Sequence, residues 1–421
     1  MHVRIGALRK ILPHSLLQAL LPLYHYVLAL SAALYYKFPS GKITVIAVTG
    51  TKGKTSTTEL INAILEETGY KTAVLNTVRF KVGSDSKQNL LKMTMPGRFF
   101  VQKFLRDAIT AQCSHAIIEM TSEGARQYRH KFIALDALVF TNIAPEHIES
   151  HGSFQNYLAA KLSIAAALEH SPKKNRVVVA NMDDVHGHEF LACRVPNKVE
   201  YRLADAAPYI LGENGATLHF RGMEIRGNDP GIISIYNILA AASLAIAYNL
   251  PIATIKKAIE KFGGTRGRLE RIEEGQSFPV IVDYAHTLES LRGLYEAFGN
   301  KKRICVFGGT GGGRDSWKRP QIGALADEYC TTIILTDEDP YDENSEKIVR
   351  DIASGIKKHS PIIEMDRRKA IRTALQSADM ESAVFITGKG TDPYIMRAHG
   401  TRELWDDATV AREELQKIRE T

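Results

Sequence analysis

Short apolar runs alternate with longer amphipathic stretches from residue 43 to the end of the chain. Runs such as ITVIAVTG (43–50), HAIIEM (115–120) and ALVFTN (137–142) are rich in β-branched residues and lead into glycine or polar residues, which is typical of buried parallel strands. The stretches between such runs, for example TTELINAILEETG (57–69), carry apolar residues at helical spacing. This alternation predicts an α/β protein with doubly wound, mostly parallel sheets.

The pattern divides the chain into three predicted parts. Residues 1–40 form a basic, apolar helical segment, residues 41–264 a central α/β domain, and residues 265–421 a C-terminal Rossmann-like α/β domain. Gly263 and Gly264 are the expected hinge between the two domains. An irregular stretch near residues 196–228 predicts short β hairpins.

The first part contains an apolar run from residue 11 to residue 36 that includes Pro22. A cleaved secretory signal is disfavoured, because the run is followed by a glycine loop whose type belongs to cytosolic proteins. Three interpretations stay open: one or two helices broken near Pro22 that pack on the body or on a protein partner, an interfacial membrane anchor, and a membrane span. We expect a cytoplasmic protein, peripheral at the inner face of the membrane if the segment is an anchor.

The net charge of +7 is concentrated at the start of the chain. The first acidic residue is Glu59, and the basic residues before it are Arg4, Arg9, Lys10, Lys37, Lys42, Lys52 and Lys54. From Glu59 onward basic and acidic residues are equal in number. The body of the protein is therefore neutral, and we expect no nucleic-acid partner.

Composition places the chain among ordinary globular proteins, with 44% hydrophobic and 24% charged residues. The four cysteines, at positions 113, 193, 305 and 330, lie far apart and form no CxxC pair. A disulfide scaffold and a zinc ribbon are both disfavoured, because a chain of this length buries a large core without them.

The first predicted strand opens into a glycine loop, Gly50-Thr51-Lys52-Gly53-Lys54-Thr55-Ser56, which an amphipathic helix follows. This is the context of a phosphate-binding loop, in which backbone N–H groups and a helix N-terminus hold phosphates and a lysine neutralises their charge. Val48 stands where the general pattern has its first glycine. The loop predicts nucleotide binding, with the Thr55 hydroxyl directed to Mg²⁺.

Two more polar side chains follow apolar strands and are expected at the same edge of the sheet. Glu119 ends one strand and His147 follows the next. Together with Thr55, a carboxylate and a histidine can hold two Mg²⁺ ions near the terminal phosphate of ATP. Lys161 lies within the helical run YLAAKLSIAAALEH, and its position alone favours a solvated lysine.

The shortened loop Thr-Gly-Thr-x-Gly-Lys-Thr resembles that of the Mur ligases and of their relatives, the folylpolyglutamate synthetases. Further stretches are similar, in the same order, to the UDP-N-acetylmuramoyl-tripeptide synthetase branch of the Mur ligases. They are EMTSEGARQYR (119–129), FTNIAPEHIESHGSFQNYLAAK (140–161), GRLE (267–270), DYAHT (283–287), GGTGGGRDSWKRP (308–320), DEDPYDE (337–343), GKGTD (388–392) and WDDATVAR (405–412). The resemblance spans roughly residues 41–421.

This resemblance implies an ATP-dependent ligase of peptidoglycan biosynthesis, in which a muramoyl-peptide carboxylate attacks the γ-phosphate of ATP and an amino acid then attacks the acyl phosphate. The implied cofactors are ATP, two Mg²⁺ ions and a carbamate, formed from carbon dioxide on Lys161, that turns a cation into an anionic metal ligand. The implied catalytic and metal-binding residues are Lys54, Thr55, Glu119, His147 and Lys161.

The resemblance also implies substrate-binding positions. For ATP they are Gly50, Thr51, Lys52, Gly53, Lys54, Thr55, Ser56, Asn142, Asn237, Arg268, Asp283 and Arg314. Thr94, Thr121, Gln127 and Arg129 match residues that contact the acceptor. Asp339, Tyr341, Gly388 and Asp392 stand in the two loops that hold the incoming amino acid.

Two departures from that branch concern the substrates. The branch carries an N-terminal domain for the uridine nucleotide, whereas here only the basic apolar segment precedes the phosphate loop, so we expect either a UDP-sugar peptide held by fewer contacts or a lipid-linked muropeptide. Glu338-Asp339-Pro340-Tyr341 replaces the Asp-Asn-Pro-Arg of diaminopimelate enzymes, and tyrosine cannot reproduce the bidentate grip of arginine on a carboxylate. We predict that meso-diaminopimelate is not recognised in the usual way.

Three other functions remain as alternatives. A folylpolyglutamate-type ligase would add glutamate to a small acid, a P-loop ATPase or kinase would release ADP without an amino acid, and a silent binding subunit would use residues 1–40 to dock a partner. The complete set of predicted catalytic residues argues against the last.

Overall fold

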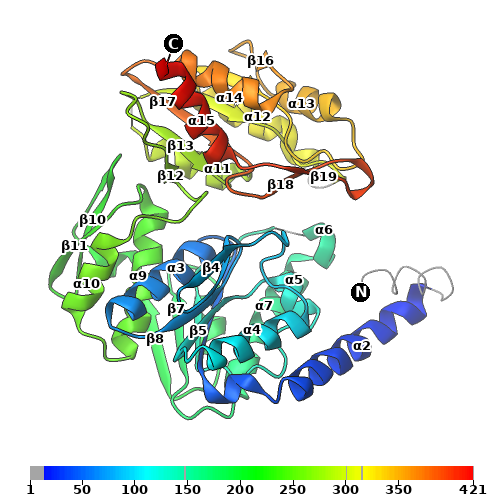
Figure 1. Ribbon diagram of the computed structural model, residues 1–421, viewed down its shortest axis with the longest axis vertical. Helices are drawn as coiled ribbons and strands as arrows, with labels where there is room; N and C mark the ends of the chain where they lie inside the picture. The colour runs from blue at the N-terminus through cyan, green and yellow to red at the C-terminus, as the bar shows by residue number, and fades with distance from the viewer. Residues whose placement is uncertain (1–13, 147, 300, 314–315, 421) are drawn as a thin grey trace. The chain divides into compact units, whose positions relative to one another are not determined.

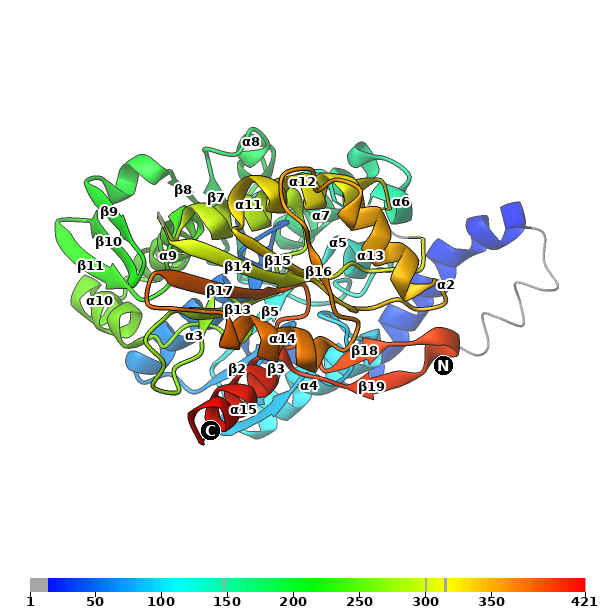
Figure 2. The same ribbon diagram turned by 90° about the horizontal axis from the view of Figure 1, so that it is seen from above.

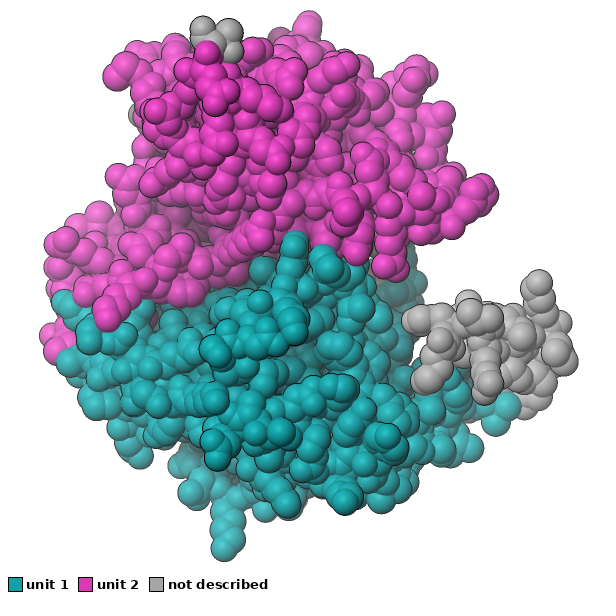
Figure 3. Space-filling view, viewed as in Figure 1, with its two compact units in different colours: residues 1–205, 237–258 teal, residues 206–236, 259–421 magenta. Residues whose placement is uncertain are grey.

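The computed structural model describes residues 14–146, 148–299, 301–313 and 316–420, which Figure 1 draws as coloured ribbons. The chain divides into two compact units, shown in different colours in Figure 3. Unit 1 comprises Met1–Asp205 and Asn237–Ala258, and unit 2 comprises Ala206–Tyr236 and Ile259–Thr421. The helix that holds Asn237 thus begins in one unit and ends in the other.

Unit 1 is built on an eight-stranded sheet in the order β4-β3-β2-β5-β1-β6-β7-β8. Strands β2, β5, β1, β6, β7 and β8 are parallel, while β3 and β4 pair antiparallel at one edge. Because β1 has β5 on one side and β6 on the other, the direction in which successive strands are added reverses there, and the crevice for a ligand is expected at the carboxyl end of β1. The bounds are β1 Thr44–Thr49, β2 Thr72–Leu75, β3 Arg79–Val82, β4 Asp85–Gln88, β5 His115–Glu119, β6 Ala137–Phe140, β7 Val177–Asn181 and β8 Asn197–Tyr201.

The helices of unit 1 cover this sheet, as the alternation in the sequence predicts. A single core cluster joins the sheet to α4, α7 and α8, and α3 lies against β1, β2 and β5. The bounds are α2 His14–Tyr35, η1 Pro39–Lys42, α3 Lys54–Glu67, α4 Arg98–Thr110, α5 Ser122–Arg126, α6 Ile148–His151, α7 Phe154–Glu169, α8 Gly187–Leu191, η2 Leu203–Ala206, α9 Ile232–Ala247 and α10 Ile252–Lys261.

Helix α2 is continuous through Pro22, so the break predicted there does not occur. Proline removes one backbone hydrogen bond, and at this exposed turn water can satisfy the carbonyl that loses its partner. The second half of the helix packs against α4 through Ala29, Ala32 and Ala33, which are buried. Within the described ranges, no helix has the length and apolar character needed to cross a membrane.

Unit 2 contains a six-stranded sheet in the order β12-β13-β17-β14-β15-β16, parallel except for β12. Its two faces carry separate core clusters: α11, α12 and α13 cover one face, and α14 and α15 the other (Figure 2). The bounds are β12 Glu270–Arg271, β13 Val280–Asp283, α11 Leu288–Glu296, β14 Lys302–Phe307, η3 Ser316–Lys318, α12 Arg319–Tyr329, β15 Thr332–Leu335, α13 Ser345–Ala353, β16 Ile362–Ile363, α14 Arg367–Gln376, β17 Ser382–Thr387 and α15 Asp407–Glu420.

Smaller antiparallel elements complete unit 2. Strands β9 (Tyr209–Gly212), β10 (Gly215–Phe220) and β11 (Met223–Gly227) form the hairpins predicted near residues 196–228, although the first strand of that stretch, β8, joins the sheet of unit 1. A second hairpin pairs β18 (Tyr394–Met396) with β19 (Arg402–Leu404), around η4 (Ala398–Gly400).

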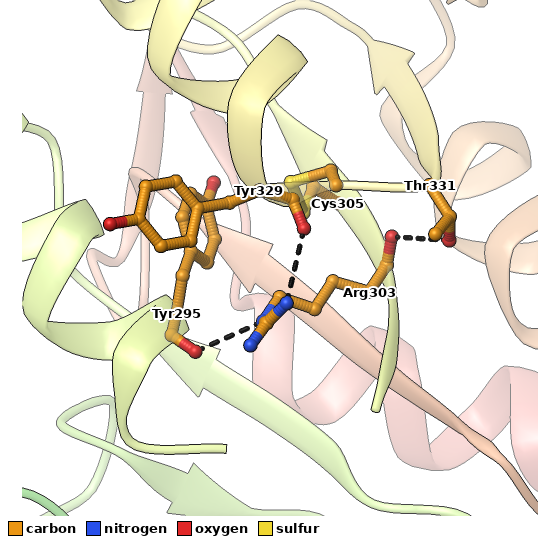
Figure 4. The surroundings of a disulfide bond; sticks show 6 residues. Tyr295, Arg303, Cys305, Tyr329 and Thr331 are labelled. Atoms are coloured by element: carbon orange, nitrogen blue, oxygen red, sulfur yellow. Dashed lines mark hydrogen bonds between the residues drawn. A yellow bond between two sulfur atoms is a disulfide. The ribbon is translucent and has the colours of Figure 1, made fainter. Parts of the chain in front are cut away.

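A disulfide joins Cys305 of β14 to Cys330, the residue after α12 (Figure 4). Both cysteines are buried in the core on one face of the unit 2 sheet. They meet because α12 crosses from β14 to its neighbour β15, which brings together residues 25 positions apart in the chain. The wide spacing of the cysteines in the sequence did not indicate this bond.

Candidate active site

The glycine loop between β1 and α3 is held from two sides. Asn142, just beyond β6, accepts a hydrogen bond from the Lys52 backbone N–H at 2.9 Å and donates to the Lys52 carbonyl oxygen at 3.1 Å. Gly53 has φ +78°, and a Cβ there would lie 2.2 Å from the side-chain oxygen of Asn237 on α9. Both the backbone conformation and this close approach require glycine. The N-terminal N–H groups of α3 stay available for phosphate.

Thr55 and Glu119 meet at the carboxyl edge of the sheet. The Thr55 hydroxyl donates to the Glu119 carboxylate at 3.0 Å, and β5 pairs with β1 so that Glu119 lies opposite Val48. Glu119 is 2% exposed and also accepts from the backbone N–H and the hydroxyl of Thr77, each at 3.0 Å. A hydroxyl and a carboxylate are oxygen ligands that suit Mg²⁺.

Thr77 was missed in the sequence. It stands two residues beyond β2, at the same sheet edge as Glu119. Its hydroxyl also lies 2.8 Å from that of Thr94, one of the predicted acceptor residues. A threonine directly after an apolar strand was the signal that could have identified it.

Lys161 lies on α7 and is 1% exposed, so it is not a solvated lysine. Its ammonium position is 2.5 Å from the carbonyl oxygen of Gly50 and 4.8 Å from the ring centre of Tyr157. The Tyr157 hydroxyl lies 2.8 Å from that of Thr51. Burial, and then the neighbouring Lys54 cation, holds the pKa of Lys161 well below the usual lysine range. This environment favours a neutral amine beside the phosphate loop.

The structure describes some of the remaining residues predicted to bind phosphate or metal, and not others. The Lys54 ammonium donates to the Thr51 carbonyl at 2.9 Å, and Ser56 is partly buried in the first turn of α3. His147 and Arg314 lie outside the described residues. Within the described ranges, which omit His147, no three His, Cys, Asp or Glu side chains gather as a metal site.

The four predicted acceptor residues lie close to one another in unit 1. The Arg129 guanidinium donates to the side-chain oxygen of Gln127 at 2.8 Å and to the carbonyl of Met95, the residue after Thr94. Thr121 caps α5 by accepting from the Gly124 N–H at 3.1 Å. Through Thr94 and Thr77, this group connects to Glu119 and so to the phosphate loop.

The ATP-binding residues predicted in unit 2 lie around the end of β13. The Asp283 carboxylate accepts from the backbone N–H groups of Leu269 and Ala285, each at 2.6 Å. Burial raises the pKa of Asp283, against the opposing effect of the Arg268 cation. The Arg268 guanidinium stacks over the ring of Tyr284 at 4.4 Å. Asn237, another predicted ATP-binding residue, belongs to unit 1 and accepts from the Thr57 hydroxyl at 3.3 Å.

The residues predicted to hold the amino acid gather around Lys389, which the sequence did not single out. Lys389 is 0% exposed and donates to Asp339 at 2.9 Å, to Asp392 at 3.2 Å and to the Tyr394 carbonyl at 2.6 Å. Tyr341 has φ +53° and donates its backbone N–H to the carbonyl of Met396 on β18 at 3.0 Å. The sequence feature that could have identified Lys389 is its position between two glycines at the end of a buried strand.

Glu338 is a further buried carboxylate in the same place. It accepts from the Thr310 hydroxyl at 3.0 Å, and burial raises its pKa. A Cβ at Gly388 would lie 2.2 Å from its carboxylate oxygen, so that position requires glycine. The carboxyl edge of the unit 2 sheet is thus rich in carboxylates.

Comparisons with known proteins agree over most of the chain. Residues 48–245 match the model of the Mur ligase middle domain, and residues 267–390 match that of the Mur ligase, glutamate ligase domain. The UDP-N-acetylmuramoyl-L-alanyl-D-glutamate–2,6-diaminopimelate ligase of Syntrophomonas wolfei is 36% identical over 402 residues, covering 92% of this chain and 81% of that protein. The UDP-N-acetylmuramyl-tripeptide synthetase of a Roseiflexus species is 35% identical, covering 93% and 82%.

Solved structures agree with this at the level of the fold. A UDP-N-acetylmuramoyl-L-alanyl-D-glutamate–2,6-diaminopimelate ligase superposes with a TM-score of 0.63 and 26% identity, covering 90% of this chain and 79% of the other. The folylpolyglutamate synthase of Mycobacterium tuberculosis superposes with a TM-score of 0.69, covering 94% and 98%, but at 14% identity it shares only the fold.

Proposed function

The chain belongs to the Mur ligase family, and from this premise we propose that it is an ATP-dependent ligase that joins an amino acid to the carboxylate of a muramoyl peptide in peptidoglycan biosynthesis. The observation that carries the proposal is the arrangement around the glycine loop. Lys54, Thr55, Glu119 and Lys161 come from three elements and lie within hydrogen-bond reach of that loop or of each other.

The reaction would proceed in two displacements. A carboxylate oxygen of the acceptor forms a bond to the γ-phosphorus of ATP while the bond to the β-phosphate oxygen breaks, giving an acyl phosphate and ADP. The neutral amine of the amino acid then bonds to the acyl carbon, inorganic phosphate leaves, and the nitrogen loses a proton. Lys54 and the N–H groups at the start of α3 would hold the phosphates in line, so the protein contributes mainly position and charge.

The residues present fit Mg²⁺. The oxygens of Thr55 and Glu119 are 3.0 Å apart and buried, and the sequence places His147 beyond the neighbouring strand. When bound, Mg²⁺ supplies neutralisation of the charge that spreads over the transferred phosphate. Asn237, which packs against Gly53, would contact the adenine, and Asp283 and Arg268 would contribute to ATP binding.

Lys161 is the proposed site of a carbamate. Carbon dioxide adds to a neutral amine, and the buried side chain donates its hydrogen bond to the Gly50 carbonyl rather than to a carboxylate. The N–C bond forms as the amine loses a proton, which leaves an anionic oxygen ligand. This modification would place negative charge next to the loop at the position where an ammonium would repel metal.

The amino acid is proposed to lack the second carboxylate of diaminopimelate. Tyr341 stands in place of the arginine that would bind that carboxylate. Without this arginine a distal carboxylate would lack its bidentate partner, whereas Asp392 could hold a distal ammonium, so lysine or ornithine would fit better.

Mass spectrometry of products tests the whole proposal. The chain would be incubated with ATP, a panel of amino acids and three acceptors: a UDP-muramoyl peptide, a lipid-linked muropeptide and a folate. We expect one amide product per ADP, with a muramoyl peptide as acceptor. Product only with folate and glutamate would indicate the folylpolyglutamate alternative, ADP release without any amide product would indicate an ATPase or kinase, and diaminopimelate as the best amino acid would refute the predicted selectivity.

Helix α2 is the proposed contact with an anionic membrane surface. Its outward stripe is apolar and exposed at helical spacing, with Leu20, Leu23, Val27 and Leu34 in line. Basic residues precede and follow the helix in the sequence, and no acidic residue occurs before Glu59. An apolar helix stripe combined with basic flanks is the pair of signals that holds a protein at the surface of an anionic bilayer.

Vesicle sedimentation tests this contact. We expect the chain to bind phosphatidylglycerol-containing vesicles, to bind phosphatidylcholine vesicles less, and to be released by salt. A Leu23→Ser/Val27→Ser variant should lose binding, while Leu404→Ser, at a similarly exposed leucine of unit 2, should not. Binding that survives the double substitution, or a stable complex with a second copy of the chain instead of vesicles, would refute the membrane contact.

A further inference from the structure

Arg98 stands at a position that favours the opposite charge. It is the first residue of α4, where the helix dipole is positive and acidic side chains are preferred. The preceding residue, Gly97, offers no side chain to cap the helix. A cation at this place costs stability, which is a common mark of a functional position.

A second arginine lies beside it. The Arg98 guanidinium donates to the carbonyl oxygen of Gln127, and the Arg129 guanidinium donates to the side-chain oxygen of the same residue at 2.8 Å. Arg129 is 8% exposed and Arg98 is partly buried. Two cations are therefore held together around one glutamine.

Among the described residues, no carboxylate forms an ion pair with either arginine, and the Glu123 charge, which acts to raise the pKa of Arg129, is outweighed by burial. The hydrogen-bond acceptors of the two guanidinium groups are backbone carbonyls, the Gln127 amide, the thioether of Met93 and the ring of His25. The Nε–H groups of both arginines are buried without an acceptor. Glu123 is nearby, but its bonded oxygen accepts from Gln127 and Arg126 instead. Burial and then the repulsion of Arg129 lower the pKa of Arg98 to about 10.

Helix α2 holds Arg98 in this place. The Nδ1 atom of His25 lies 2.6 Å from a terminal nitrogen of the Arg98 guanidinium, which can only donate. His25 must therefore be neutral, and burial with the Arg98 charge lowers its pKa to about 4. A segment of the chain 73 residues away thus fixes the direction of the guanidinium.

We propose that Arg98, together with Arg129, forms a subsite for an oxyanion of the acceptor, a carboxylate or a phosphate, and that His25 is its positioning residue. Arginine suits this role because its planar fork binds both oxygens of such a group. The acceptor is the substrate concerned because Arg129 bonds to Met95, next to Thr94, whose hydroxyl leads through Thr77 to Glu119. The inference rests on the proposed function for the identity of the acceptor.

Equilibrium binding by calorimetry, without ATP, tests the subsite independently of catalysis. The probes are a UDP-muramoyl dipeptide, the same muramoyl dipeptide without phosphate, and its form with the peptide carboxylates amidated. Arg98→Gln should weaken binding about 10- to 100-fold, the loss of one charge-assisted hydrogen-bonding group. Arg106→Gln is the matched control, since this arginine of the same helix donates, among the described residues, to the carbonyls of Tyr36 and Lys37.

The pattern over the three probes identifies the oxyanion. A loss that persists without phosphate assigns the subsite to a carboxylate, and a loss confined to the UDP-linked probe assigns it to a phosphate. His25→Phe should also weaken binding, and His25→Asn, which keeps an acceptor atom, should restore part of it. In steady-state assays of Arg98→Gln, the KM for the acceptor should rise. The kcat and the KM for ATP should stay nearly unchanged.

The outcomes separate this inference from the proposed function. If the unaltered chain makes product and Arg98→Gln binds all three probes as well as Arg106→Gln does, the subsite is refuted and the ligase function stands. If the unaltered chain binds a probe but makes no product, the ligase function fails and the binding ratio alone decides the subsite. If it binds none of the three, the subsite is refuted.

Discussion

Each unit buries one lysine near a glycine loop at the carboxyl edge of its parallel sheet, but the two lysines have different partners. Lys161 of unit 1 reaches the Gly50 carbonyl, with the Lys54 cation nearby. Lys389 of unit 2 lies between the carboxylates of Asp339 and Asp392. Carboxylates form ion pairs with the buried lysine of unit 2, whereas burial and a second cation lower the pKa of the lysine of unit 1. The ion pairs of Lys389 stabilise the two loops that hold Asp339 and Asp392. The surroundings of Lys161 suit a reactive nitrogen.

The largest expected effect is on activity, at the lysine of unit 1. Lys161→Ala should lower the ligation rate by about 10²- to 10³-fold, because the charge that the carbamate supplies near the phosphate is removed. Removal of bicarbonate from the assay should slow the unaltered enzyme and leave the variant unchanged, and a short carboxylic acid should partly restore the variant. Lys198→Ala, an exposed lysine of unit 1, is the control. A Lys161→Ala variant within a few fold of the unaltered rate would contradict the carbamate.

The next effect is on stability, at the lysine of unit 2. Lys389→Met leaves Asp339 and Asp392 buried without their cation, and the free energy of unfolding should fall by about 3–5 kcal/mol in urea titrations. Adding Asp339→Asn and Asp392→Asn should recover most of the loss. Lys161→Met should cost less, since no carboxylate bonded to it is left unpaired. Equal losses for the two single variants would remove the distinction between the lysines.

The disulfide distinguishes the two units in a third way. Replacing Cys305 and Cys330 by alanine opens a loop of 25 residues, and the unfolding free energy of unit 2 should fall by about 3 kcal/mol under oxidising conditions. Reductant should lower the unfolding free energy of unit 2 in the unaltered protein to that of the double alanine variant. Cys193→Ala, at a buried free cysteine of unit 1, should have a smaller effect that reductant does not change. A transition insensitive to reductant would mean that the bond does not form in solution.

The smallest expected effect is the pH dependence, which should have opposite signs in the two units. Burial lowers the pKa of His130 in unit 1 to about 4, below its unfolded value of about 6.5. The contribution of His130 to the stability of unit 1 is therefore present above pH 6.5 and is lost as the pH falls toward 4. Burial and Asp283 raise the pKa of Asp229 in unit 2 to about 7, so stability is lost there as the pH rises from about 4 to 7.

Unfolding followed by amide hydrogen exchange between pH 5 and pH 7 measures both slopes. Each group should contribute about 1–2 kcal/mol over this window. His130→Leu should flatten the slope of unit 1, and Asp229→Asn that of unit 2. Parallel slopes in both units, unaffected by these substitutions, would show that other groups dominate the titration.

Much of unit 1 could be predicted because its signals are local. The strand before Gly50, the turn at Gly53 and the helix from Lys54 follow from residue type over a few positions, and Glu119 was expected at the same edge because parallel strands end together. The α/β alternation was equally visible in unit 2. These predictions needed only the steric preferences of neighbouring residues.

Other features depended on partners far away in the chain. The pairing of Lys389 with Asp339 joins residues 50 positions apart, and the contact of His25 with Arg98 joins residues 73 apart. Helix α2 continues through Pro22, which the residues around it did not predict, and the carboxylate that accepts from the Thr77 hydroxyl lies on another strand. No local pattern carries this information.

The amino-acid sequence by itself determined the order of strands and helices, the phosphate loop and the polar residues that end the strands, because backbone sterics and hydrophobic periodicity act over a few residues. Only the tertiary structure decided which buried charges are paired. Lys161 lies in a helical run and Lys389 between two glycines after an apolar strand, and the packing of the sheets placed a carbonyl beside the first and two carboxylates beside the second. The charge of a buried group depends on such neighbours, which the fold brings together.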